Sequence, residues 1–441
     1  MFRSVFGTAI GRFLFGTFIL LAIVSATVYF IVTPLLSGGC INDLAQCLTQ
    51  SGWDAGAAEF LTIVLGVMGV ATFPLLVTIL LIWVERKFAA RIQDRVGPNR
   101  VGPFGLIQPL ADVVKLLGKE DLTPAGADKL VFNTAPVVMV MSVLLIWAVV
   151  PFTPYHVGVD LEIGALYFVA VASIGTLSVI MASWASNNKY ALLGAFRVVA
   201  QLISYEIPLA MALLIPVMLA GSMSMVGIVE AQAGMWFMFV SPIAAFMFFI
   251  SSQAETGRAP FDLIEAESEL VAGFNIEYSG MKFAMFFAGE FMHVFTNGVL
   301  MAIMFTGGWW GPFAYEAPLL AVFYLLGKAF FWYLLSLLMR NALPRVRIDQ
   351  LMAINWKFLV PISIVNLLMT ALLLRLIQEG GLSPENASSF VDNIPQTLIL
   401  LAGNVVLFGI VMTLLRGRAR GERMTDMVVR EDVELAPATG D

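Results

Sequence analysis

Acidic residues gather in one loop, residues 255–282, of an otherwise apolar chain. Asp262, Glu265 and Glu269 follow one another at i, i+3 and i+7 spacing, so a helix would place the three carboxylates on one face. Carboxylates packed close together cannot all ionise freely, and this property suits proton transfer. The alternative is an acidic face turned to solvent. The candidate proton-carrying carboxylates of this loop are Asp262, Glu265, Glu267, Glu269 and Glu277.

Other ionisable residues lie within or beside long apolar stretches. Glu206 falls roughly two to three helical turns after Arg197, at the end of one such stretch. A carboxylate at bilayer depth costs on the order of 2.5–3.5 kcal/mol, so Glu206 should face protein or water unless it reaches the interface. Glu290 and Lys328 each lie inside an apolar stretch, and they are candidates for a pair across helices. His293, one turn after Glu290, is expected to be a packed polar side chain.

A charged segment from Glu85 to Asp121 contains RVGP twice, and each Gly-Pro predicts a turn or break. The residues that follow predict an amphipathic helix in the headgroup plane, with Asp112, Lys115 and Lys119 facing away from its apolar side. Such a helix beside a basic loop would suit a lateral opening for a lipid-soluble ligand. The alternative is a solvated loop that binds anionic lipid heads. The apolar positions are Leu106, Leu110, Val113, Val114 and Leu117.

Composition excludes several classes of protein. The 441 residues are 59% hydrophobic and 13% charged, whereas soluble domains carry about 25% charged residues. No basic stripe lies on a soluble domain, so nucleic acid is not an expected partner. Two cysteines and two histidines are too few for an iron–sulfur or zinc site of the usual kind, and no GxGxxG opens a nucleotide-binding unit. The chain is therefore expected to bind no metal and no redox cofactor of its own.

Apolar windows long enough to span a bilayer, about 20 residues each, number about ten and predict an all-α polytopic bundle. Apart from Lys328 and Arg375, every Lys and Arg falls in alternate gaps between these windows, whereas the opposite gaps carry acidic residues. By the positive-inside rule the basic gaps are cytoplasmic, as are both termini. The windows lie near 13–36, 60–83, 130–152, 163–186, 207–229, 231–254, 283–306, 317–339, 358–378 and 394–415.

The two ends of the chain differ from its centre. The first apolar run is longer than the 7–15 residues of a cleavable signal, so it is expected to remain as a helix. Cys40 and Cys47 share the first external loop, where a disulfide is one possibility. Residues 416–441 are polar and are expected to form a disordered cytoplasmic tail. Near the last windows, Arg375 and Glu379 are spaced for an i,i+4 pair.

Four segments together resemble the family of the H subunit of bacterial NADH:quinone oxidoreductase, respiratory complex I, which includes mitochondrial NADH dehydrogenase subunit 1. The segments begin at Glu85, Ser186, Arg258 and Leu343 and read ERKFAARIQDRVGPNRVGPFGLIQPLADVVKLL, SNNKYALLGAFRVVAQLISYE, RAPFDLIEAESELVAGFNIEYSGMKF and LPRVRIDQLMAINWKFLVP. The resemblance covers residues 59–378, and four long motifs in order are specific.

The resemblance implies a membrane subunit that forms much of the cavity through which ubiquinone or another quinone enters. It implies that quinone is a substrate, that FMN and iron–sulfur clusters reside in partner subunits, and that proton translocation is coupled to quinone reduction. It further implies a bacterial inner-membrane location, with peripheral-arm subunits, neighbouring membrane subunits and lipid as partners. By the same resemblance, Arg86, Arg91, Arg258 and Phe261 match the cavity side. The coupling carboxylates implied are Glu206, Asp262, Glu265, Glu267, Glu269 and Glu277.

The sequence departs from the family's usual core of about eight helices. Residues 1–58 add an N-terminal helix and external loop, and residues 379–415 add an external loop and a C-terminal helix; these additions would suit a lipid or a partner. The family often has an aromatic-Ile-Gly run where this chain has Phe291, Met292 and His293, so no role is carried over to His293. Two alternatives are the homologous membrane subunit of a hydrogenase-type complex and, from another class, a stand-alone ion transporter.

Overall fold

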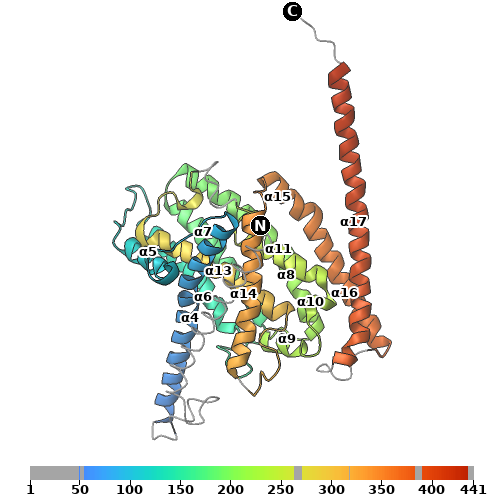
Figure 1. Ribbon diagram of the computed structural model, residues 1–441, viewed down its shortest axis with the longest axis horizontal. Coiled ribbons are helices and arrows are strands. Elements are labelled where there is room, and N and C mark those ends of the chain that lie inside the picture. Colours follow the sequence, from blue (N-terminus) through green and yellow to red (C-terminus); the bar gives the residue numbers. More distant parts are fainter. Residues whose placement is uncertain (1–48, 50–53, 263–270, 317, 383–389, 436–441) are drawn as a thin grey trace, which may run out of the picture.

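The computed structural model describes residue 49 and residues 54–262, 271–316, 318–382 and 390–435. Helices make up nearly all of the regular structure in these ranges, and an isolated antiparallel bridge joins Pro151 to Val157. The helices form one bundle, from which the end of the last helix projects (Figure 1). The expectation of an all-α polytopic bundle is confirmed, and the chain is a multi-pass membrane protein.

The helices of the bundle include both long spans and single turns. In chain order they are α4 (Ala55–Ile92), η2 (Pro103–Gly105), α5 (Gln108–Leu117), α6 (Lys129–Ile146), η3 (Trp147–Val149), α7 (Gly164–Ala185), α8 (Lys189–Ala220), α9 (Met225–Ala231), α10 (Phe237–Val240), α11 (Pro242–Glu255), η4 (Gly273–Asn275), α13 (Gly280–Phe305), α14 (Pro318–Ala342), α15 (Ile348–Ile354), η5 (Asn355–Leu359, a π-helical turn), α16 (Val360–Glu379) and α17 (Phe390–Leu435).

Eight helices of the described ranges are long and apolar enough to cross a membrane. Of the ten expected windows, the first lies outside the described residues. The window at 231–254 differs from expectation because it contains two shorter helices, α10 and α11, separated at Ser241. The break has a local cause: Ser241 has non-helical backbone angles and Pro242, at the first position of α11, has no N–H to donate. The candidate spans are Ala55–Ile92, Lys129–Val149, Gly164–Ala185, Lys189–Ala220, Gly280–Phe305, Pro318–Ala342, Ile348–Glu379 and Phe390–Thr413.

Helix α13 forms the centre of the bundle, since 83% of its most apolar 18-residue window is buried. It packs against α14, α6, α11 and α4, and its side chains Phe295 and Phe305 are buried in the main hydrophobic core. Figure 1 shows α15 near the top of the bundle, below the projecting end of α17, and α9 near the bottom of the bundle. The described parts of the loops expected to be cytoplasmic, residues 93–128, 186–188, 256–262, 271–279 and 343–347, define what we call the basic end of the bundle.

Prolines inside two spans free carbonyl groups that side chains of other segments then satisfy. Pro208 in α8 has no N–H, so the Ser204 carbonyl loses its helical partner and accepts a bond from Asn355 Nδ2 at 2.7 Å instead. Pro136 in α6 likewise frees the Phe132 carbonyl, which accepts from the Tyr278 hydroxyl at 3.2 Å. Because no water is available in a bilayer to satisfy such groups, these bonds fix α8 to η5 and α6 to the loop before α13.

The C-terminal segment differs from the expected disordered tail. Helix α17 continues beyond its apolar span to Leu435, and its last part projects away from the bundle (Figure 1). Residues 416–435 contain five Arg, three Glu and two Met residues, and these favour helix once a span has already formed its first turns. The segment is therefore a polar extension of the last span.

A glycine on α13 permits its close approach to α14, because a Cβ at Gly298 would lie 2.9 Å from the Ala329 carbonyl oxygen. We predict that Gly298→Val destabilises the protein by about 1–3 kcal/mol through overpacking. Gly69→Val on α4 is the matched control, because a Cβ there has no neighbour within 4 Å. Thermal unfolding of the purified variants in detergent checks this, and equal midpoints for the two variants would contradict it.

Candidate functional site

A buried ion cluster joins three elements at the basic end of the bundle. Glu85 of α4 accepts a hydrogen bond from Arg258 Nη1 at 2.7 Å and also pairs with Arg340 of α14. The Tyr333 hydroxyl lies 3.5 Å from the same carboxylate. The Arg258 guanidinium also lies 4.1 Å from the centre of the Phe291 ring, in a cation–π contact with α13. We call Glu85, Arg258 and Arg340 the arginine cluster.

The segment after α11 is held against α8 by a single amide. Gln201 Nε2 donates to the carbonyl oxygens of Ala254 at 2.7 Å and Phe261 at 2.9 Å, so it binds both ends of the turn that contains Arg258. Phe261 is buried, and its ring centre lies 5.9 Å from that of Tyr205. The structure therefore brings together Arg258 and Phe261, which the sequence placed on the cavity side, within a rigidly held turn.

Two carboxylates and a histidine lie close to this turn. Glu206 is half-buried on α8, and its charge acts on Glu255 at the end of α11. Glu255 is buried, and its Oε1 lies 3.7 Å from Nε2 of His293 on α13. The sequence indicates Glu206 as a candidate coupling carboxylate, but it gives no such role to Glu255 or His293. Their juxtaposition depends on how α11 packs against α13, which no local pattern indicates.

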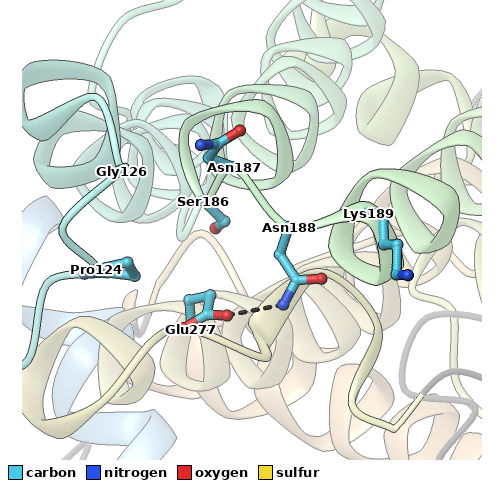
Figure 2. A pocket seen from close by; sticks show the side chains of 7 residues that line it. All are labelled: Pro124, Gly126, Ser186, Asn187, Asn188, Lys189 and Glu277. Carbon is cyan, nitrogen blue, oxygen red and sulfur yellow. Dashed lines mark hydrogen bonds between the residues drawn. The ribbon is translucent and has the colours of Figure 1, made fainter.

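The remaining acidic candidates are distributed differently. Asp262 is half-buried directly after Phe261, and Glu265, Glu267 and Glu269 lie outside the described residues. Glu277 lies at a different place from Glu206. It lines a cavity of about 430 Å³ together with Asn188 and Lys189, and Glu206 does not line this cavity. Figure 2 shows the Asn188 amide turned toward Glu277, to whose Oε1 it donates at 2.7 Å.

The residue after Glu277 fixes that corner of the bundle. Tyr278 stacks on Phe132 with ring centres 4.1 Å apart, and it donates to the carbonyl freed by Pro136. Burial raises the pKa of the Tyr278 hydroxyl, so it remains a neutral donor throughout the physiological range. Glu277 is thus held by a fixed backbone, next to a buried anchor.

The expected amphipathic helix is present as α5, and its apolar stripe is exposed. Leu110, Val114 and Leu117 are 51%, 63% and 63% exposed along one face. As expected, Asp112 lies on the side opposite this stripe, where it forms an ion pair with Arg86 of α4. That pair holds the polar side of α5 against the bundle, and within α5 Gln108 Nε2 donates to the same carboxylate at 3.4 Å.

The turns before α5 follow the Gly-Pro motifs. Gly97 and Gly102 have φ angles of 70° and 72°, a left-handed region that favours glycine, and Pro103 begins η2. Phe104, within η2, is 77% exposed and adds an aromatic ring to the apolar surface of α5. Arg91, on the last turn of α4, is exposed nearby along the chain. The segment therefore offers an apolar face with arginines beside it.

Lys328 and Glu290 do not pair, so this expectation was wrong. Lys328 Nζ donates to the carbonyl oxygens of Gly308 and Trp310, at 2.9 Å each, and lies 5.0 Å from the Trp236 ring centre. These partners follow the end of α13, whereas Glu290 is 15 residues before that end, roughly 22 Å along the helix axis. Lys328 therefore fixes the loop that follows α13, on the side of the bundle opposite its basic end. The expected pair of Arg375 and Glu379 is confirmed at 3.0 Å.

Metal ligands are not grouped in the part of the chain that the structure describes: it contains no cluster of three or more His, Cys, Asp or Glu side chains able to hold a metal ion. Cys40 and Cys47 lie outside that part, so their pairing stays a prediction. The ionisable residues of these clusters that the sequence did not indicate as candidates are Glu85, Glu255, His293 and Arg340. The one signal in the sequence that could have indicated the arginine cluster is a carboxylate directly after an apolar window, as at Glu85.

The arrangement defines a class: a multi-pass α-helical membrane protein that concentrates buried ionisable groups and an exposed apolar helix at one end. The family model described as NADH dehydrogenase matches residues 61–371. The H subunit of NADH-quinone oxidoreductase from Dehalococcoides mccartyi strain CBDB1 is 47% identical over 299 residues, covering 68% of this chain and 83% of that protein. H subunit 1 of the same enzyme from Geobacter metallireducens is 48% identical, covering 67% of this chain and 91% of its own length.

A third relative extends the match. H subunit 2 of NADH-quinone oxidoreductase from Syntrophobacter fumaroxidans is 46% identical over 331 residues, covering 72% of this chain and 96% of its own length. The chain belongs to the NADH dehydrogenase family. The names of these relatives agree with the family that the four loop segments resemble, rather than with a hydrogenase-type complex or a stand-alone transporter.

The arginine cluster should be a stability determinant. We predict that Glu85→Ala destabilises the protein by about 3–5 kcal/mol, because it leaves two arginine charges near one another without their common carboxylate. Glu379→Ala is the matched control: it removes the carboxylate of an exposed i,i+4 pair and should change stability by less than about 0.5 kcal/mol. Thermal unfolding in detergent measures both effects, and similar losses in the two variants would contradict the prediction.

Proposed function

We propose that this chain is the membrane subunit of a proton-translocating NADH:quinone oxidoreductase that forms much of the quinone-access cavity and couples quinone reduction to proton pumping. Its family membership supports this assignment, as does the grouping of ionisable residues at the basic end. Partner subunits supply FMN and the iron–sulfur clusters; this chain supplies a lipid-facing entrance, fixed charges and carboxylates. It resides in the bacterial inner membrane with both termini in the cytoplasm.

The quinone enters beside α5. A quinone has an apolar tail and a polar headgroup, so it needs an apolar surface that continues into a polar interior. The exposed stripe of α5 and Phe104 provide the apolar surface, and Arg86 is fixed at its edge by Asp112. Farther inside, Arg258 and Phe261 lie on the turn held by Gln201. Arg91 completes the set of cavity-side residues, and its exposure suits contact with the headgroup on entry.

Coupling rests on the carboxylates next to this turn, and their burial is the observation that carries the proposal. Glu255 is buried at the basic end of α11 and Glu206 is half-buried near the middle of α8, close enough for their charges to interact. Two unit charges about 4 Å apart interact by about 4 kcal/mol at an effective dielectric constant of about 20. That energy changes a protonation equilibrium by about a thousandfold, so a charge change on the quinone can move a proton among Glu206, Asp262, Glu277 and the carboxylates at 265, 267 and 269.

The coupling role is tested by the ratio of protons pumped to electrons transferred. We predict that Glu206→Gln in the intact complex, reconstituted in vesicles, lowers this ratio by about twofold or more, because an amide cannot take up the proton. Glu230→Gln is the matched control, since Glu230 lies in the last turn of α9, at the opposite end of the bundle. An unchanged ratio for Glu206→Gln would remove this residue from the coupling path.

The entrance is tested by labelling. A quinone analogue with a photoreactive group on its tail should label α5 near Leu110 and Val114, because these side chains are exposed on its apolar face. Excess quinone should suppress the labelling, and Leu110→Glu should reduce it. Labelling that appears only at other spans, or that excess quinone leaves unchanged, would contradict an entrance at α5.

A further inference from the structure

Three polar side chains form a buried group between α11 and α13. Glu255 Oε1 lies 3.7 Å from His293 Nε2, and Asn297 follows His293 by one helical turn. Asn297 Nδ2 donates to the Ser252 carbonyl at 3.2 Å. Glu255 Oε2, His293 Nε2 and Asn297 Oδ1 are buried, and within the described ranges none of the three atoms has a partner at normal hydrogen-bond geometry, although the Asn297 side chain lies close enough to Glu255 to favour its charged form.

The geometry is unlike that of a structural ion pair. In the arginine cluster the Glu85 carboxylate contacts Arg258 at 2.7 Å, within the usual range of a hydrogen bond, whereas Glu255 and His293 are separated by 3.7 Å. A buried polar atom without a partner opposes folding. The pair of Glu255 and His293 therefore adds no more to the stability of the fold than apolar side chains of similar size would. Long contacts of this kind are common between groups that transfer a proton and approach each other only during the reaction.

The chemistry of the two side chains supports transfer. Histidine is the side chain that most readily accepts and releases a proton near neutral pH. Glu255 as a neutral acid beside a neutral His293 carries the same total charge as a carboxylate beside an imidazolium. Proton movement between them therefore buries no additional net charge, and this avoids the main cost of ionising a group inside a membrane bundle.

The neighbouring charges can bias this equilibrium. Glu206, from α8, acts electrostatically on Glu255, and two negative carboxylates repel each other. Glu290 lies one turn before His293 on α13, and Arg258 follows Glu255 by three residues while its guanidinium contacts Phe291. With Glu206 ionised the neutral pair is favoured; with Glu206 protonated the ion pair is favoured. The state of Glu206 thus decides where the proton of Glu255 resides.

We propose that His293 is a proton-carrying residue of this chain: it takes the proton of the Glu255 carboxyl group on Nε2 and returns it when the charge of Glu206 changes. The O–H bond of Glu255 breaks and the N–H bond of His293 forms, leaving a carboxylate and an imidazolium, with no oxidation or reduction. This inference rests on the proposed coupling function. It extends that function from the basic loops into the central helix α13.

The test uses the intact complex in vesicles and measures protons pumped per electron. His293→Gln keeps a side chain of similar size that cannot carry a proton, and it should lower the ratio by about twofold or more. The second histidine provides the control: His156→Gln, in the loop at the opposite end of the bundle, should leave the ratio unchanged. Imidazole added to the His293→Ala complex should restore part of the ratio, which a purely structural role would not allow.

The outcomes separate this inference from the function on which it rests. A normal ratio in His293→Gln together with a lowered ratio in Glu206→Gln overturns the role of His293 and leaves the coupling function intact. Normal ratios in both variants overturn both. If His293→Gln fails to assemble, His293→Asn is used, and failure of both variants, or a normal ratio in the fraction that assembles, assigns His293 to folding and overturns the inference.

Discussion

A charge inside a membrane bundle must have a partner, and this constraint organises the basic end of the protein. Glu85 is buried on α4, and Arg258 and Arg340 both bind it from other parts of the chain. Because desolvation makes an unpaired charge costly, the three segments are fixed relative to one another. The turn that contains Arg258 and Phe261 is consequently held in place at both ends, by the arginine cluster and by Gln201.

That fixed turn connects the two proposed activities. On one side Arg258 of this turn binds Glu85 of α4, the helix that precedes α5 and its exposed apolar stripe in the chain. On the other side the turn follows Glu255, which interacts with Glu206. A ligand that changes charge near this turn would change the protonation equilibria of Glu255 and Glu206. Burial makes it costly to ionise such a carboxylate. Burial also makes its protonation sensitive to nearby charges, since electrostatic interactions are stronger where water is excluded.

The sequence predicted the fold class and most spans because a membrane imposes a simple rule: each backbone group must be satisfied within a helix. It predicted the Arg375–Glu379 pair because i,i+4 spacing is local. It missed the arginine cluster because its members lie 173 and 255 residues apart from Glu85, and no local pattern encodes such pairing. The assumed pair of Glu290 and Lys328 was wrong because sequence shows that a charge lies in a span, but not its depth.

In the candidate site, too, some residues could be predicted from the sequence and others could not. Glu206, Arg258 and Phe261 were found from their motifs and are brought together by α8 and the turn after α11. The pairing of Glu255 with His293 required the packing of α11 on α13, which a single sequence does not specify. Asp112 lies on the polar face of α5 as its spacing indicates, but the sequence does not show that this polar face, rather than the apolar one, meets the bundle.

The central claim is that reduction of the quinone changes the protonation of buried carboxylates in this chain. Infrared difference spectra of the intact complex, recorded between the oxidised and reduced quinone states, measure this directly through the C=O stretch of protonated carboxyl groups. The account predicts a carboxyl band that changes on reduction and that is lost or shifted in Glu206→Gln. A difference spectrum without a carboxyl band, or one identical in the wild-type and Glu206→Gln complexes, would contradict it.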